Sequence, residues 1–105
     1  MHNLHILPNP LLKELKEVAL DFESIGIQLV LFGSFATGDA RPTSDLDLAY
    51  DSHSMSRESL RQLYSRIEDL HTIRSVDLVD LQKVDPEVAL KIKNNGYLLS
   101  ECLAD

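Results

Sequence analysis

Cysteine and long apolar runs are both scarce in this sequence of 105 residues. Cys102 is the only cysteine, which excludes a disulfide framework within the chain and a thiolate metal site, and fits a reducing compartment. No stretch approaches the roughly 18 consecutive apolar residues typical of a membrane-spanning helix. Residues 1–10 lack the basic and then apolar pattern of a signal peptide. We therefore expect a cytoplasmic protein.

Basic residues are also few, with 10 Lys and Arg against 17 Asp and Glu, so the net charge is −7. Nucleic-acid backbones are bound by clusters of Lys and Arg, and the basic residues here are scattered. This composition argues against a general nucleic-acid surface. A bound nucleotide would have to be held by metal and backbone N–H groups, and an acidic body associates more readily with a basic partner.

The length and the 44% apolar content suit one globular domain spanning residues 1–105, with residues 1–8 as a loose arm. Hydrophobic periodicity and turn residues predict the order helix, strand, short helix, strand, helix, strand, helix, an α/β domain of two or three layers. The first expected helix starts at Asn9-Pro10 and has an apolar face from Leu11 to about Ser24. The expected strands are Ile27–Phe32, Ser44–Tyr50 and Ser75–Leu81, with a short edge strand at Tyr97–Leu99. The other expected helices are one turn at Phe35–Thr37, a helix capped by Ser56 with Tyr64 in its apolar stripe, and a last helix that starts at Asp85-Pro86 and runs through Val88, Ala89 and Ile92.

Two aspartates one residue apart occur in an otherwise apolar strand-like segment. The two-residue period of a strand places Asp45 and Asp47 on one face and Leu46 and Leu48 on the other. Carboxylates this close repel each other, and burying them is costly unless a cation lies between them. Because Mg²⁺ prefers oxygen ligands and is commonly bound by one or two carboxylates plus substrate phosphates, the pair predicts a metal site.

The preceding strand ends at Gly33-Ser34, ten residues before Asp45. A strand followed by a small-residue turn and a helix start offers free backbone N–H groups to phosphate. Glycine permits a close approach, and the Ser34 hydroxyl can reach a phosphate oxygen. A plain turn is the alternative reading of Gly-Ser alone, but its spacing to the aspartate pair favours a nucleotide site.

A third carboxylate is predicted in the last long strand. Asp77 and Asp80 are three residues apart and cannot share a face of a regular strand. Asp77 lies mid-strand among apolar residues and needs a partner, whereas Asp80 lies where the chain turns. Asp77 is therefore the better candidate, and Asp80 stays the alternative.

Gly33-Ser34, ten residues, and then Asp45-x-Asp47 resembles the signature of the nucleotidyltransferase superfamily that includes DNA polymerase beta. The short chain looks like the minimal nucleotidyltransferase (MNT) group, often encoded beside a HEPN-domain protein as antitoxin to toxin. The resemblance implies a small mixed sheet flanked by helices, with Asp77 as the third metal-site aspartate.

The resemblance implies a metal-dependent transfer of AMP from ATP to a hydroxyl, with two Mg²⁺ ions at Asp45, Asp47 and Asp77 and the phosphates at Gly33 and Ser34. It also implies a HEPN toxin as partner in a hetero-oligomer, silenced by adenylylation (AMPylation) of a tyrosine. The metal-binding strands and four helices use nearly the whole sequence, so we expect the acceptor to come from another polypeptide.

The sequence departs from the family at Phe35 and Thr37, where basic residues are common. Arg41 is then the basic residue nearest to the expected phosphate site. Two alternatives therefore stay open. One is an MNT-fold module, with weak or no catalysis, that neutralises its partner by contact. The other is a transferase that modifies a small hydroxylated molecule.

Overall fold

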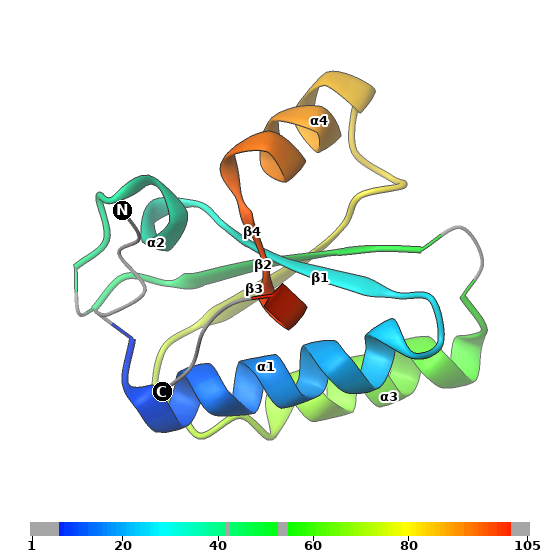
Figure 1. Ribbon diagram of the computed structural model, residues 1–105, viewed down its shortest axis with the longest axis horizontal. Coiled ribbons are helices and arrows are strands. Elements are labelled where there is room, and N and C mark those ends of the chain that lie inside the picture. Colours follow the sequence, from blue (N-terminus) through cyan, green and yellow to red (C-terminus); the bar gives the residue numbers. More distant parts are fainter. Residues whose placement is uncertain (1–6, 42, 53–54, 102–105) are drawn as a thin grey trace.

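The structure is a computed structural model that describes residues 7–41, 43–52 and 55–101. Within these residues it contains helices on both faces of a four-stranded sheet (Figure 1). The elements in chain order are α1 (Asn9–Glu23), β1 (Gln28–Phe32), α2 (Ser34–Thr37), β2 (Leu46–Asp51), α3 (Arg57–Glu68), β3 (Val76–Asp80), α4 (Pro86–Asn95), β4 (Tyr97–Leu98) and the 3₁₀ helix η2 (Leu99–Glu101).

The sheet is mixed, with the strand order β3-β2-β1-β4. β1 pairs antiparallel with both β2 and β4, whereas β2 pairs in parallel with β3. The parallel connection runs through α3, because parallel neighbours need a crossover that returns the chain to the same end of the sheet. The predicted fold class, a small mixed sheet flanked by helices, is confirmed.

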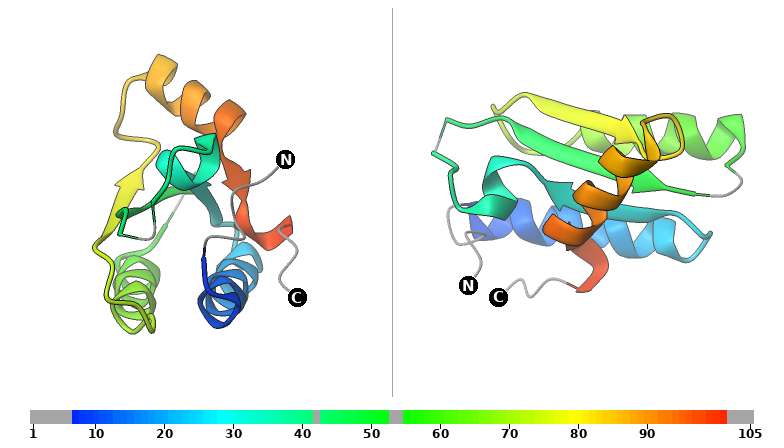
Figure 2. Two further views of the ribbon diagram at one scale, coloured as in Figure 1. Left: turned by 90° about the vertical axis from the view of Figure 1, so that its left-hand side faces the viewer. Right: turned by 90° about the horizontal axis from the view of Figure 1, so that it is seen from above.

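The helices form two unequal layers (Figures 1 and 2). α1 and α3 cover one face of the sheet, and the main core between them and the strands contains Leu15, Leu31 and Leu48, each with no exposed surface. α4 lies across the opposite face over a smaller core built on Val30, Ala49 and Leu81. The two-residue alternation of each strand decides which residues meet which layer.

The turn chemistry read from the sequence sets most of the helix boundaries. α1 begins one residue after Pro8 and ends shortly before Gly26, whose φ of 87° is in the left-handed region. α3 begins after Ser56, whose hydroxyl oxygen accepts a hydrogen bond from the Ser59 N–H at 3.0 Å, as predicted for an N-cap. α4 begins at Pro86, also as predicted.

Three sequence-based expectations differ from the structure. β2 begins at Leu46, so Asp45 precedes the strand instead of lying within it. Tyr64, expected in the apolar stripe of its helix, is 42% exposed. Most of the loose arm predicted for residues 1–8 lies outside the described residues, but Leu7 is buried in the main core.

Candidate active site

Asp47 and Asp77 lie side by side on neighbouring parallel strands. The register of β2 and β3 pairs them directly, so both side chains stand on the same face of the sheet. This is the face that carries α4, since Leu46 and Leu48 on either side of Asp47 pack into the main core under α1 and α3. Asp47 is half-buried and Asp77 is exposed. The tertiary structure thus brings together two carboxylates that are 30 residues apart in the sequence.

Asp45 joins this pair from the end of the loop before β2. The loop closes with two hydrogen bonds between Arg41 and Ser44, in which the Arg41 N–H donates to Ser44 Oγ at 2.8 Å and the Ser44 N–H donates to the Arg41 carbonyl at 2.9 Å. This turn ends the loop immediately before Asp45, which is exposed. The predicted pair is therefore retained, but with one member on the strand and one at its entrance.

The pKa of Asp47 is shifted by its position in the cluster. Burial, then the negative charge of Asp77, and then that of Asp45 raise the pKa of the Asp47 carboxyl above its usual range. Like charges that act on one another in this way favour the uncharged form of the most buried member. The charges of Asp45 and Asp77 therefore both act on Asp47. No positively charged group of the described residues is among the causes that shift the pKa of Asp47.

Gly33 makes room for the Asp47 carboxylate. It has φ 77° and ψ −150°, a conformation that is essentially restricted to glycine. A Cβ atom at this position would lie 2.1 Å from Asp47 Oδ2 and 2.9 Å from its Cγ. Gly33 is thus required twice, once for its backbone conformation and once because a carboxylate occupies the space that a side chain would fill.

The short helix α2 follows Gly33 directly. No described residue accepts a hydrogen bond from the Ser34 or Phe35 N–H, as expected for the first residues of a helix. The Phe35 side chain is fully buried in the main core and anchors α2, with the Arg74 guanidinium 5.7 Å from its ring centre. Position 35 therefore faces the core, whereas Thr37 is exposed.

Asp80, the alternative third carboxylate, lies on the other face of the sheet. The register pairs it with Tyr50, which packs into the main core under α1 and α3. After burial, the charge of Asp80 is the next cause that raises the pKa of the Tyr50 hydroxyl. Asp80 Oδ1 also accepts a hydrogen bond from the Gln82 N–H at 2.9 Å. Asp80 is therefore separated from Asp47 by the sheet, whereas Asp77 is beside it.

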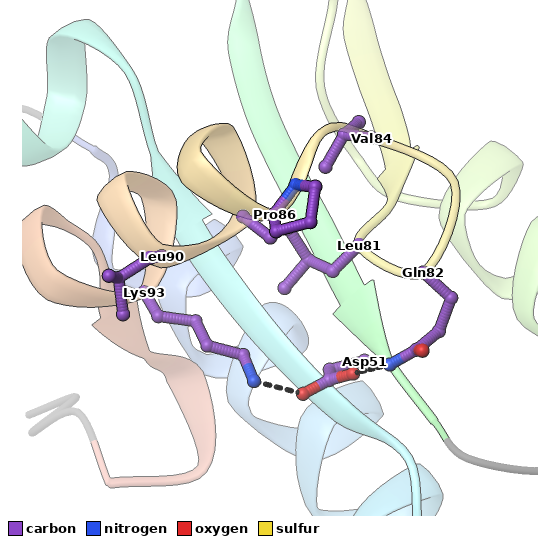
Figure 3. Close-up of a pocket in the computed structure, with 8 residues that line it drawn as sticks. Asp51, Leu81, Gln82, Val84, Pro86, Leu90 and Lys93 are labelled. Carbon is purple, nitrogen blue, oxygen red and sulfur yellow. Dashed lines mark hydrogen bonds and ion pairs between the residues drawn. The ribbon is translucent and has the colours of Figure 1, made fainter.

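An ion pair that no sequence pattern predicts holds α4 above the sheet. Lys93 Nζ lies 2.6 Å from Asp51 Oδ2 at the end of β2, and the Gln82 amide donates to Asp51 Oδ1 at 2.6 Å (Figure 3). The Asp51 side chain is only 10% exposed. Because α4 has no fully buried residue of its own, this polar contact is a principal constraint on its position. Only the fold brings these residues together, and no local spacing predicts the contact.

The donor set suits a hard divalent cation. Asp45, Asp47 and Asp77 supply only oxygen ligands, which Mg²⁺ prefers, and the raised pKa of Asp47 marks a place where positive charge would be stabilising. Within residues 7–41, 43–52 and 55–101, however, no three His, Cys, Asp or Glu side chains converge as a ready-made metal site. The carboxylates therefore fit the ion chemically and would have to turn toward it.

Comparison with known proteins identifies the family to which this sequence and fold are similar. The sequence matches the family "Polymerase beta, Nucleotidyltransferase" over residues 13–102. Among solved structures, a toxin–antitoxin crystal structure with AMP-PNP is similar at 21% identity and a TM-score of 0.56, with coverage of 80% of this chain and 71% of that chain. A protein from Sulfolobus solfataricus assigned as a nucleotidyltransferase is similar at 22% identity and a TM-score of 0.49, with coverage of 84% and 78%. No curated protein matches the chain significantly.

The chain belongs to the polymerase beta-type nucleotidyltransferase family, since the match spans most of its length. The resemblance to that superfamily, expected from Gly33-Ser34 and Asp45-x-Asp47, is therefore confirmed. The domain is a nucleotidyltransferase domain. In the part of the chain that the structure describes, no helix combines the length and apolar character needed to cross a membrane.

Proposed function

We propose that this domain transfers AMP from ATP to a hydroxyl group on a partner protein, and that Asp45, Asp47 and Asp77 carry the reaction. The observation that carries the proposal is the direct pairing of Asp47 with Asp77 on one face of the sheet, next to the Gly33-Ser34 turn. Phosphoryl and nucleotidyl transfer depend mostly on positioning and on neutralising phosphate charge. A carboxylate cluster beside a backbone turn supplies the residues for both tasks.

Asp45, Asp47 and Asp77 would hold Mg²⁺, with two ions as the family resemblance implies. Bound there, the metal would neutralise the triphosphate and stabilise the oxygens that enter and leave the reacting phosphorus. The raised pKa of Asp47 supports this assignment, because the cluster is unfavourable as three free charges. The fully oxygen-based ligand set argues for a hard cation and against zinc or copper.

The Gly33-Ser34 turn would position the triphosphate. The N–H groups of Ser34 and Phe35 donate to no described residue and are available to phosphate oxygens. The Ser34 hydroxyl adds a further donor. Because Gly33 has no side chain, the Asp47 carboxylate can lie directly beside this backbone, so a metal ion held by Asp47 would be close to phosphates bound at the turn.

Asp77 would act on the acceptor. Its carboxylate is exposed, while Asp47 beside it is half-buried, so an incoming hydroxyl reaches Asp77 more easily. In the proposed reaction the acceptor oxygen bonds to the α-phosphorus, the bond from that phosphorus to the β-phosphate oxygen breaks, and pyrophosphate leaves. The hydroxyl proton goes to Asp77 or to water.

The proposed partner class is argued from similarity and from net charge. The toxin–antitoxin relative with AMP-PNP is consistent with a toxin as partner and ATP as donor. The net charge of −7 favours a partner with a basic surface. We propose a HEPN-domain toxin as the partner, with a tyrosine hydroxyl as the acceptor, and an antitoxin role for this chain as a protein adenylyltransferase.

A contact-only antitoxin is the second candidate. It is favoured by one observation, namely that no complete metal site is formed among the described residues. Such a protein would silence its partner by binding and would not need its carboxylates for chemistry. The double variant Asp45→Asn/Asp47→Asn separates the candidates, since a contact-only protein would still neutralise its partner and an enzyme would not.

The direct test is incubation of the purified chain with Mg²⁺, ATP and the product of the neighbouring gene, followed by intact-mass spectrometry of both proteins. The proposal predicts that the partner gains one or more AMP units and that Asp45→Asn abolishes the gain. A stable complex that silences the partner without any mass change would favour the contact-only module.

A further inference from the structure

A cavity of about 210 Å³ opens between α4 and the end of β1, next to the proposed phosphate turn. Its walls are apolar and come from Phe32 on β1 and from Val88 and Ile92 on α4, and Gly33 forms part of its lining. Val88 is 45% exposed in this wall, although it is a large apolar residue. The cavity therefore offers apolar surface that the fold itself does not cover.

Gly33 connects this cavity to the carboxylates. Asp47 Oδ2 occupies the space that a Gly33 side chain would fill, and Gly33 itself lines the cavity. Phe32 pairs with Asp47 across β1 and β2, so both side chains stand on the same face of the sheet. A ligand with its phosphates at Gly33 and Asp47 therefore has an apolar cavity within reach of its other end.

We infer that this cavity holds the base of the donor nucleotide. The inference rests on the proposed function, because it takes the phosphate end of the nucleotide to lie at Gly33 and the carboxylates. A volume of about 210 Å³ is smaller than the roughly 300–1,000 Å³ of pockets that enclose a whole small ligand. The cavity therefore suits one planar base, with the ribose and the phosphates outside it.

The chemistry of the lining fits a base better than an aliphatic group. The Phe32 ring is an aromatic surface of the kind on which bases stack. The lining also contains the polar residues Thr37, Lys91 and Asn95. The Asn95 amide can donate to and accept from the edge of a base. A purely hydrophobic ligand would leave these polar groups without a role.

Lys91 adds charge where the family signature is weakest. Position 37 carries threonine where the resemblance leads us to expect a basic residue. Lys91 of α4 lines the same cavity as Thr37. No described carboxylate forms an ion pair with Lys91. In a chain of net charge −7 this ammonium group is placed to meet an anionic ligand as it enters the cavity.

The test compares the binding of Mg²⁺–ATP with that of Mg²⁺–tripolyphosphate, which lacks the nucleoside. Wild-type protein is expected to bind ATP roughly tenfold or more tightly, the gain typical of stacking one base. Val88→Trp, which puts an indole into the cavity wall, is expected to remove this preference and to leave tripolyphosphate binding unchanged. Leu90→Trp is the matched control, since Leu90 is a 60% exposed residue of the same helix that does not line this cavity.

A second pair of variants guards against a local effect at position 88. Asn95 lines the cavity, so Asn95→Trp is expected to remove the preference for ATP over tripolyphosphate, as Val88→Trp does. Asn94 is its neighbour in the chain but does not line the cavity, so Asn94→Trp is expected to keep the wild-type preference. Wild-type protein that binds neither ligand would contradict the proposed function itself. Wild-type protein that binds both while Val88→Trp and Asn95→Trp keep the ATP preference would overturn this inference alone. If Val88→Trp and Asn95→Trp keep the ATP preference but lose binding of the partner protein, the cavity is a protein contact, and the inference is overturned.

Discussion

Asp47 Oδ2 occupies the space above Gly33 that a Cβ atom would fill, at 2.1 Å from the position of that atom. Glycine and aspartate are thus one unit, although 13 residues separate them between strands β1 and β2. The contact joins the two parts of the family signature physically. The Gly-Ser turn needs the aspartate strand beside it, and the aspartate needs a residue without a side chain opposite it.

Gly33→Ala is predicted to abolish transfer while the chain still folds. The new methyl group displaces the Asp47 carboxylate, and misplacing a catalytic group by about 1 Å can cost roughly 100-fold in rate. The nearest atoms belong to a side chain that can rotate, so the loss of stability should be near the strain of the backbone conformation, about 1–3 kcal/mol.

Gly26→Ala is the control for that strain. Gly26 also has a positive φ, of 87°, but a Cβ atom there would meet nothing within 4 Å. Its substitution is predicted to lower the free energy of unfolding by about 1–2 kcal/mol and to leave transfer intact. Equal activity of the two variants, measured as AMP incorporation alongside denaturant unfolding, would show that the Gly33–Asp47 contact does not matter.

Asp47→Asn is predicted to stabilise the metal-free protein. Burial and the charges of Asp77 and Asp45 raise the pKa of Asp47, so the ionised form is unfavourable in the folded state. Removing that charge should raise the melting temperature at pH 7. Glu17→Gln, which removes an exposed carboxylate, should change it little.

The pH dependence of this effect has a defined sign. Because the pKa of Asp47 is higher in the folded than in the unfolded state, the folded protein binds more protons, and the destabilisation appears as pH rises through that pKa. The advantage of Asp47→Asn should therefore shrink on acidification. Saturating Mg²⁺–ATP should stabilise the wild type and not the variant. A variant that is less stable than wild type in metal-free buffer at pH 7 would contradict the electrostatic account.

Asp77→Asn and Asp80→Asn are predicted to differ sharply in activity. Asp77 pairs with Asp47 on the α4 face, whereas Asp80 pairs with Tyr50 on the opposite face. Asp77→Asn should reduce transfer by at least about 100-fold. Asp80→Asn should keep transfer near wild type and change stability by less than about 1 kcal/mol, because the Asn Oδ1 can still accept from the Gln82 N–H. Strong loss of activity in Asp80→Asn with an intact fold would reverse the assignment.

Lys93→Ala is predicted to loosen α4. It removes the 2.6 Å ion pair with Asp51, whose side chain is 10% exposed, and so leaves a mostly buried carboxylate without its cation. A loss of about 1–2 kcal/mol is expected by chemical denaturation. Lys91→Ala, on the same helix and without an ion pair among the described residues, should cost less than about 0.5 kcal/mol. Equal losses for the two lysines would show that the ion pair contributes nothing.

Much of the fold follows from local sequence patterns. The order of elements, the Ser56 cap and the Gly26 stop are all governed by residues near one another in the chain, which is why periodicity and turn chemistry predict them. The hydrophobic pattern predicts that β2 begins at Ser44, two residues before its observed start at Leu46, because the hydrogen bonds between Arg41 and Ser44 hold the preceding segment in a turn. Alternating hydrophobicity does not reveal such a side-chain contact.

The site is predictable only in part for the same reason. Asp45 and Asp47 are recognisable by their spacing, and the choice of Asp77 over Asp80 follows from its position in the middle of an apolar strand. The pairing of Asp77 with Asp47 depends on the parallel register of β2 and β3, which no local pattern specifies. The Lys93–Asp51 ion pair and the cavity beneath α4 likewise arise from the packing of distant segments.

The most direct test of the central claim follows two labels of ATP onto the partner protein. The chain and the product of the neighbouring gene would be incubated with Mg²⁺ and ATP labelled at either the α- or the γ-phosphate. The account predicts that only the α-label is incorporated into the partner, at similar levels with wild type and Asp80→Asn, and that Asp77→Asn incorporates none. Incorporation of the γ-label, or undiminished α-label with Asp77→Asn, would contradict nucleotidyl transfer by this carboxylate cluster.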